Sequence, residues 1–256
     1  MSRTEEPPGT VTAAVLIIGN EILSGRTRDA NLSYLATELN KAGVRLMEAR
    51  VVADIEAEII AAVDTLRARY DYVLTTGGIG PTHDDITAAA IAKAFGVRLM
   101  RHPDAVAALA ARLRPKDLNE ARLKMADVPE GSVLITNPVS AAPGFRIGNV
   151  FVLAGVPSIM QAMFHSLKHA LVGGAPMLAR AIATNLAEGA IAEGLTALQN
   201  RHREVEIGSY PFYRVGRFGV SLVIRSTDQA AIDRTAEELK AMLAGLGGEM
   251  LEEADG

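Results

Sequence analysis

The sequence has no cysteine and no tryptophan, and aromatic residues fill only 4% of its 256 positions. Without cysteine the chain has no disulfide, no cysteine-ligated metal cluster and no thiol nucleophile, and we expect a reducing, cytoplasmic location. Scarce aromatic side chains argue against a stacking platform for single-stranded nucleic acid. Lysine and arginine total 26 against 30 aspartates and glutamates, so no excess of positive charge attracts nucleic acid either. We therefore expect no nucleic-acid partner.

Long apolar runs are also missing from the sequence. The longest run, Val11–Ile18, is far shorter than the roughly 20 residues that cross a bilayer. Residues 1–10 are polar and have neither the basic start nor the cleavage pattern of a signal peptide. We therefore expect residues 1–10 to be a flexible tail and the protein to have no membrane partner.

Short apolar runs alternate with amphipathic stretches along the N-terminal two thirds of the chain. Runs rich in Val, Ile and Leu predict strands at residues 11–18, 44–52, 71–76, 97–100, 133–135 and 150–154. Helical spacing of apolar residues predicts helices from Asp29 to Gly43, at 55–70, at 84–95, at 103–125 with a break at Pro115, and at 157–171. This alternation predicts a parallel sheet with helices on both faces.

The pattern changes after the segment 172–176, which has the Gly and Pro content of a linker. The order beyond it is strand, helix, strand, turn, strand and helix. The predicted elements are strands at 179–186, 204–213 and 218–225, helices at 188–200 and 227–246, and a hairpin turn at Val215-Gly216. The C-terminal part is therefore predicted to be a small α+β domain.

The most informative motif is Gly77-Gly78-Ile79-Gly80-Pro81-Thr82, which follows a predicted buried strand and precedes a helix. Glycines let a backbone approach an anion closely and turn its N–H groups inward, and ligands of open α/β sheets bind at this edge. The motif is neither a Walker A loop nor a G-x-G-x-x-G fingerprint. It predicts a phosphate site, with a tight turn that binds nothing as the alternative. The expected contacts are Thr76, Gly77, Gly78, Gly80, Pro81 and Thr82.

Acidic residues follow three of the predicted strands: Glu21, Asp54, and Asp84 with Asp85. The carboxyl ends of parallel strands share one edge, so we expect these acids to line one rim. Magnesium binds through one or two carboxylates together with phosphate oxygens, and the rim therefore predicts a metal site. Helix capping is the alternative for Asp54, and for Asp85 in a box with Thr82, because Asp84 and Asp85 are expected in the first helical turn.

Two further segments are candidate ligand contacts. Residues 137–145 form a long loop of small residues, which is typical of a lid and equally of an ordinary surface loop. Residues 154–158 predict another strand-to-helix turn, with Pro157 at the helix start. Thr27 and Arg28 either contact a phosphate or simply begin a helix.

Several of these segments resemble the molybdopterin-binding family of MoaB and Mog proteins, and its CinA-like branch more closely. The resemblance is greatest to the N-terminal, molybdopterin-binding-like half of eukaryotic FAD synthase. The matching segments are residues 19–25, Asp54, residues 75–87, residues 142–145 with 155–157, and Ile207-Gly208-Ser209-Tyr210-Pro211 in the C-terminal part.

The resemblance implies a three-layer α/β/α domain over residues 11–172, which binds a pterin or nucleotide phosphate at the glycine motif, and a small α+β domain over 177–256. It adds Pro143, Gly144, Gly155 and Pro157 as ligand contacts. In the adenylyltransferases of the family, acids matching Asp54 and Asp85 serve metal-dependent AMP transfer to molybdopterin. CinA-like proteins use the equivalent domain as a metal-dependent ADP-ribose pyrophosphatase, and in FAD synthase this half is associated with FAD hydrolysis.

The sequence also departs from these relatives. It contains neither the CinA amidohydrolase domain nor the ATP-using domain of FAD synthase, so FAD synthesis by this chain is not expected. Asn20 stands where many relatives carry an acid, which weakens one metal ligand.

We therefore expect a pyrophosphatase that hydrolyses a dinucleotide such as FAD or ADP-ribose and depends on Mg²⁺, Mn²⁺ or Co²⁺. Asp54 and Asp85 are the expected catalytic residues, and Glu21, Asp54, Asp84 and Asp85 the expected metal ligands. The alternatives are a protein that binds or adenylates molybdopterin, and a non-catalytic nucleotide-binding oligomer. The resemblance also implies a homo-oligomer, either a dimer or a trimer.

Overall fold

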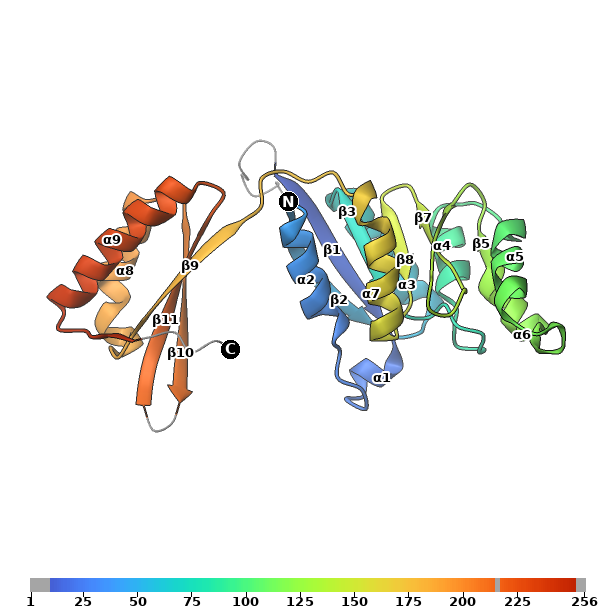
Figure 1. The fold of residues 1–256 in the computed structure, drawn as a ribbon, viewed down its shortest axis with the longest axis horizontal. Coiled ribbons are helices and arrows are strands. Elements are labelled where there is room, and N and C mark those ends of the chain that lie inside the picture. The colour runs from blue at the N-terminus through green and yellow to red at the C-terminus, as the bar shows by residue number, and fades with distance from the viewer. Residues whose placement is uncertain (1–9, 215–216, 252–256) are drawn as a thin grey trace. The chain divides into compact units, whose positions relative to one another are not determined.

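The computed structural model describes residues 10–214 and 217–251, which form two compact units (Figure 1). The boundary between the units falls after Gly174, within the predicted linker. Residues 1–9 of the predicted tail 1–10, and the predicted hairpin turn at 215–216, lie outside the described residues. Within the described ranges, no helix combines the length and the apolar composition that a membrane span needs.

A six-stranded mixed sheet forms the centre of the first unit (Figure 1). Its strands, in spatial order, are β2 (Val44–Val52), β1 (Val11–Ile18), β3 (Tyr72–Thr76), β8 (Val150–Leu153), β7 (Gly144–Ile147) and β6 (Val133–Ile135). The first four strands are parallel to one another. At one edge, β7 pairs antiparallel with β8, and β6 pairs antiparallel with β7. The fold is therefore the predicted mostly parallel α/β sheet.

Helices cover both faces of this sheet. They are α2 (Asn31–Lys41) and α7 (Pro157–Leu167) on one face, and α3 (Glu56–Arg69) and α4 (Thr87–Ala94) on the other. Strand β1 is buried on both sides because it lies between the two layers: Val15 packs into the cluster under α2 and α7, and Leu16 into the cluster under α3 and α4. This burial accounts for the continuous apolar run in the sequence.

Smaller elements complete the first unit. They are α1 (Asn20–Leu23), α5 (Pro103–Arg112), α6 (Glu120–Leu123), short 3₁₀ turns at Pro115–Asp117, Lys124–Ala126 and Lys168–Ala170, and a ribbon of β4 (Leu99–Arg101) with β5 (Asp127–Pro129). The predicted break at Pro115 is confirmed. Strands β5 and β7 were not expected: β5 closely follows the predicted helical stretch 103–125, and β7 begins within the predicted loop 137–145.

The second unit is a small α+β domain, as predicted. Its antiparallel sheet has the order β10 (Glu206–Arg214), β11 (Arg217–Ser226), β9 (Leu178–Thr184) and β12 (Met250–Leu251). Helices α8 (Glu188–Arg201) and α9 (Gln229–Gly245) pack against one face of it. The core between them is fully buried and aliphatic, and includes Ile191, Leu198, Leu222 and Leu239.

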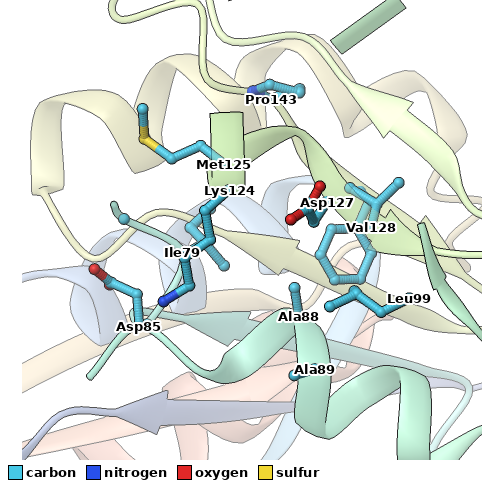
Figure 2. A pocket seen from close by; sticks show the side chains of 13 residues that line it. Ile79, Asp85, Ala88, Ala89, Leu99, Lys124, Met125, Asp127, Val128 and Pro143 are labelled. Atoms are coloured by element: carbon cyan, nitrogen blue, oxygen red, sulfur yellow. The ribbon is translucent and has the colours of Figure 1, made fainter. Parts of the chain in front are cut away.

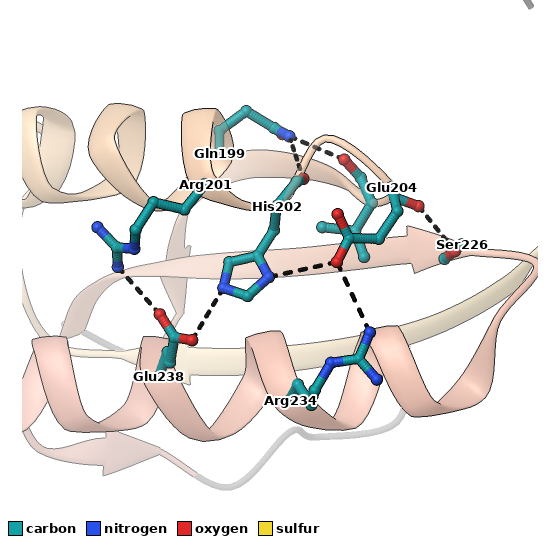
Figure 3. Close-up of polar contacts among 8 residues, drawn as sticks. Gln199, Arg201, His202, Glu204, Ser226, Arg234 and Glu238 are labelled. Carbon is teal, nitrogen blue, oxygen red and sulfur yellow. Dashed lines mark hydrogen bonds and ion pairs between the residues drawn. The ribbon is translucent and has the colours of Figure 1, made fainter.

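His202 connects three segments of this second unit (Figure 3). Its Nε2 lies 3.0 Å from Oε1 of Glu238 on α9, and its Nδ1 lies 3.5 Å from Oε1 of Glu204. Arg201 and Arg234 pair with the same two carboxylates. Hydrogen bonds from His202 and Arg201 lower the pKa of Glu238. These ion pairs link the end of α8 to α9.

Candidate functional site

Residues 77–82, which we call the glycine loop, turn the chain at the carboxyl end of β3. Gly77 and Gly78 have φ angles of 105° and 67°, in the left-handed region that favours glycine. A Cβ on Gly77 would lie 2.1 Å from the carbonyl oxygen of Ile18, and one on Gly78 would lie 2.2 Å from Oγ1 of Thr87. Both the backbone angles and the close contacts therefore require glycine at these positions.

Two hydrogen bonds from Thr87 hold the glycine loop, whereas three of its own N–H groups have no partner in the described part of the chain. The Thr87 hydroxyl donates to the Gly77 carbonyl at 3.0 Å, and the Thr87 N–H donates to the Gly78 carbonyl at 3.0 Å. In contrast, the backbone N–H groups of Gly78, Ile79 and Gly80 make no hydrogen bond to any described residue. Three consecutive N–H groups are therefore available to hydrogen-bond the oxygens of an anion.

The acids after the loop do not lie where the sequence predicted. Helix α4 begins at Thr87 rather than at Asp84, so neither Asp84 nor Asp85 belongs to its first turn. Asp85 folds back instead: its Oδ2 accepts the Thr82 backbone N–H at 2.8 Å and the Thr82 hydroxyl. The predicted contact between Thr82 and Asp85 thus forms, but it closes the loop instead of capping a helix. Asp84 stays exposed, and the nearby Thr82 hydroxyl lowers its pKa.

Lys124 is a loop contact that sequence reasoning missed. Its Nζ donates to the Thr82 carbonyl at 2.5 Å, and its charge adds to the Thr82 hydroxyl in lowering the pKa of Asp84. The residue lies in a 3₁₀ turn at the end of the predicted helical stretch 103–125. A lysine in such a stretch gives no signal in the sequence, because only the tertiary fold brings it to the loop.

Asp54 and Glu21 lie together at the carboxyl ends of β2 and β1. Oδ2 of Asp54 accepts the backbone N–H of Asn20 at 2.8 Å, whereas the N-cap position of α3 is Ile55, with no side-chain cap. Helix capping therefore does not account for Asp54. The Glu21 carboxylate folds back over Gly19, where a Cβ would lie 2.6 Å from it. Glu21 and Asp54 follow β1 and β2, and Asp85 follows β3, so these acids come after neighbouring strands, and a shared metal site among them stays a prediction.

The predicted metal ligands do not form a metal site by themselves. Within residues 10–214 and 217–251, no three His, Cys, Asp or Glu side chains gather closely enough to hold an ion. One or two of Glu21, Asp54, Asp84 and Asp85 would fit a divalent cation only if phosphate oxygens and water completed its coordination, which is how Mg²⁺ is commonly bound.

A solvent-open hollow of ≈ 410 Å³ lies on the α4 side of the glycine loop, and we call it the α4 hollow (Figure 2). Lys124 and Asp127 bring charge to it, and Leu99, Val128 and Phe145 make its wall largely apolar. It also takes in several predicted site residues, which are Gly78, Gly80, Asp85 and Pro143.

A second hollow of ≈ 340 Å³, the α2 hollow, lies at the starts of α2 and α7. Four residues named as site candidates from the sequence, Thr76, Gly155, Pro157 and Glu21, line it, and so do Thr27 and Arg28. Asn31, which sequence reasoning did not single out, contributes a buried side chain. Ile79 packs against the apolar clusters on both faces of the sheet, so the glycine loop stands between the two hollows.

The remaining predicted contacts lie elsewhere. Pro81 is exposed at the tip of the loop, outside the lining of both hollows. Gly144 belongs to β7, where a Cβ would lie 2.3 Å from the Val152 carbonyl oxygen, so packing between strands accounts for this glycine. The loop before it is organised by buried Asn137, which accepts the N–H groups of Val139 and Ser140.

Comparison with known proteins agrees with this architecture. Residues 14–173 match the family described as "Probable molybdopterin binding domain", and residues 176–247 match the "FAD synthase, middle domain" family. The chain belongs to the molybdopterin-binding domain family. The expected resemblance is confirmed over both units.

Individual relatives fall into the two expected groups. The chain is 34% identical to "Probable FAD synthase" of Caenorhabditis elegans over 96% of its own length and 52% of that protein. It is 38% identical to a CinA-like protein of Desulfosudis oleivorans over 60% of its own length and 39% of that protein. The solved CinA structure from Thermoplasma acidophilum is 36% identical, with a TM-score of 0.60, and covers 63% of this chain and 98% of that one. The chain spans about half the length of its FAD synthase relative.

Proposed function

We propose that this chain binds a dinucleotide across the glycine loop and hydrolyses its pyrophosphate, with FAD or ADP-ribose as the substrate class. The observation that carries the proposal is the set of three N–H groups at Gly78, Ile79 and Gly80 that no described residue pairs, with a hollow on each side. In a dinucleotide the pyrophosphate has a nucleoside or sugar on each side. In the structure the glycine loop likewise has one hollow on each side. The family match supports a phosphate-bearing ligand at this edge.

The proposed reaction is attack of water on one phosphorus of the pyrophosphate. A new P–O bond forms to the water oxygen, and the bond to the bridging oxygen breaks. The bridging oxygen leaves on the other phosphate, and the water proton is released to solvent or to a carboxylate. FAD would give AMP and FMN, and ADP-ribose would give AMP and ribose 5-phosphate. No covalent intermediate is needed, because the water attacks phosphorus directly.

The chain supplies binding and orientation in this reaction. The loop N–H groups hold a phosphate, and Asp85 keeps the loop in shape through Thr82. Asp54 and Glu21 place negative charge at the neighbouring strand ends, where one or both would bind a divalent cation shared with the phosphates. Such a cation would supply Lewis acidity at the phosphoryl oxygen.

The family match also favours a second candidate, a protein that binds or adenylates molybdopterin. A pterin phosphate would use the same loop. The two candidates differ in the reaction: AMP is released by water in the first and is transferred from ATP to a pterin in the second.

The test is AMP release from FAD, ADP-ribose, NAD and ATP with Co²⁺, Mn²⁺ or Mg²⁺, and with EDTA. We expect metal-dependent release from one dinucleotide, which Asp85→Asn lowers about a hundredfold. Asp104→Asn is the matched control, because Asp104 is exposed on α5 and lines neither hollow. Absence of release from every compound, with binding retained, would contradict hydrolysis and favour the second candidate or a non-catalytic binding protein.

A further inference from the structure

Asn31, at the start of α2, has a buried side-chain amide whose nitrogen is hydrogen-bonded and whose oxygen is not bonded to any described residue. The residue is 4% exposed, and its Nδ2 donates to the Gly155 carbonyl at 2.8 Å. A carbonyl only accepts, so this bond fixes which end of the amide is nitrogen. The oxygen, Oδ1, consequently points away from Gly155, is buried, and has no hydrogen-bond partner among the described residues. Asn31 lines the α2 hollow.

Thr76, at the end of β3, also lines the α2 hollow with a buried polar atom that has no described partner. The residue is 1% exposed, and its Oγ1 also finds no partner within residues 10–214 and 217–251. It lies two residues after Leu74, whose side chain packs under α2 and α7, so Thr76 is on the face that carries the α2 hollow. A buried polar atom without a partner costs about 1–3 kcal/mol, and two in one hollow indicate groups that a ligand satisfies.

The other polar atoms of the hollow show what kind of ligand group fits. Glu21 contributes a carboxylate and Asn31 an amide oxygen, both of which accept hydrogen bonds. The Asp29 carboxylate is already paired, because it accepts the backbone N–H groups of Asn31 and Leu32. Glu21 and Arg28 are both exposed, whereas Asn31 is buried. The buried amide oxygen attracts an O–H or N–H donor and repels a phosphate oxygen. In dinucleotide-binding folds, an acidic side chain likewise accepts a hydrogen bond from a ribose hydroxyl.

We infer that the α2 hollow receives the ribose of the AMP half, the part that FAD and ADP-ribose share, with a ribose hydroxyl donating its proton to Asn31 Oδ1 and a ribose hydroxyl oxygen accepting from the Thr76 hydroxyl. This inference rests on the proposed function and deepens it. It gives the bound nucleotide a direction: the AMP sugar lies on the α2 side, and the second half of the dinucleotide lies in the α4 hollow.

Thr76→Val separates recognition from folding. Valine has nearly the same shape and suits a strand, so removing an unpaired buried hydroxyl should leave the melting temperature unchanged or raise it. Thr75→Val is the matched control, because Thr75 is the adjacent buried threonine, also has an Oγ1 that no described residue pairs, and lines neither hollow. Asn31 is a poorer choice, since any change there also removes its bond to Gly155.

The experiment measures the affinities of AMP, 2′-deoxy-AMP and 3′-deoxy-AMP by ligand-observed NMR in EDTA, up to millimolar ligand. We expect the natural chain to bind at least one deoxy compound three- to tenfold more weakly than AMP, as loss of one hydrogen bond implies. Thr76→Val should bind AMP three- to tenfold more weakly and lose that discrimination, whereas Thr75→Val should keep both. Equal affinity of the natural chain for all three compounds would overturn this inference alone. Failure of the natural chain to bind AMP at all would also overturn this inference, whereas the proposed function is judged separately by AMP release from the dinucleotides.

Discussion

Two loops of the first unit look alike in sequence and differ in the structure. The glycine loop and residues 137–143 are both rich in small residues, and both are candidates for ligand contact. In the second loop, buried Asn137 accepts the N–H groups of Val139 and Ser140 and donates to Ser140 Oγ and the Ala142 carbonyl. In the glycine loop, three successive N–H groups have no partner in the part of the chain that the structure describes. A loop whose N–H groups are paired within the loop has few donors left for a ligand, whereas the open N–H groups of the glycine loop are available to one.

Replacing Gly77 by alanine should have the largest effect. The new Cβ would meet a backbone carbonyl that cannot move away, at a φ that L residues avoid. We expect the free energy of unfolding to fall by roughly 3 kcal/mol or more, measured by urea denaturation. Gly96→Ala is the matched control: its φ is 65°, but nothing lies within 4 Å, so only about 1–2 kcal/mol should be lost. Equal losses in the two variants would show that the loop is not closely packed.

Asp85→Asn should separate the shape of the glycine loop from the stability of the fold. The amide still accepts one hydrogen bond from Thr82 but has lost the charge. We expect AMP release to fall about a hundredfold, as for loss of a single orienting group, while the free energy of unfolding changes by less than about 1 kcal/mol. An unchanged rate of AMP release would show that Asp85 has no role in the reaction.

Asn137→Ala should give the opposite result, with a loss of stability rather than of phosphate binding. Several hydrogen bonds to a buried side chain disappear together, and we expect the unfolding free energy to fall by about 2–3 kcal/mol. Titration with AMP should give the same affinity as the natural chain. A greater loss of affinity than of stability would mean that this loop also contacts the ligand.

The His202 cluster of the second unit consists of ion pairs among its own residues. We expect its effect on stability to be the smallest of those predicted. The pKa of Glu238 is lowered by His202 and Arg201, so its contribution to stability is present above its ordinary value of 4.5 and lost as the pH falls below it. We expect the melting temperature to fall more steeply below about pH 4.5 in the natural chain than in His202→Gln. Parallel curves would show that the cluster does not stabilise the unit.

Much of this fold is predictable from the sequence, and the reason is burial. Strands β1 and β2 have the predicted bounds, because a continuous or alternating apolar run of this length is typical of a strand packed in a sheet. The start of α4 was wrong by three residues, since the acids Asp84 and Asp85 suit a helix start equally well when the fold is unknown.

The site was less predictable than the fold. The glycine motif and the acids at the strand ends were visible as residues with special backbone or charge properties. Asn31 and Lys124 were not, because an asparagine on a helix and a lysine in a polar stretch are ordinary until distant segments meet. Their importance comes from contacts with Gly155 and Thr82, which are 124 and 42 positions away in sequence.

The open N–H groups of the glycine loop are the proposed phosphate site. The most direct test follows the backbone amide resonances of a ¹⁵N-labelled chain during titration with ADP-ribose in EDTA. We expect the signals of Gly78, Ile79 and Gly80 to shift downfield and to saturate together, while those of Val139 and Ser140 stay in place. Saturable binding that leaves the three glycine-loop signals unmoved would contradict the account.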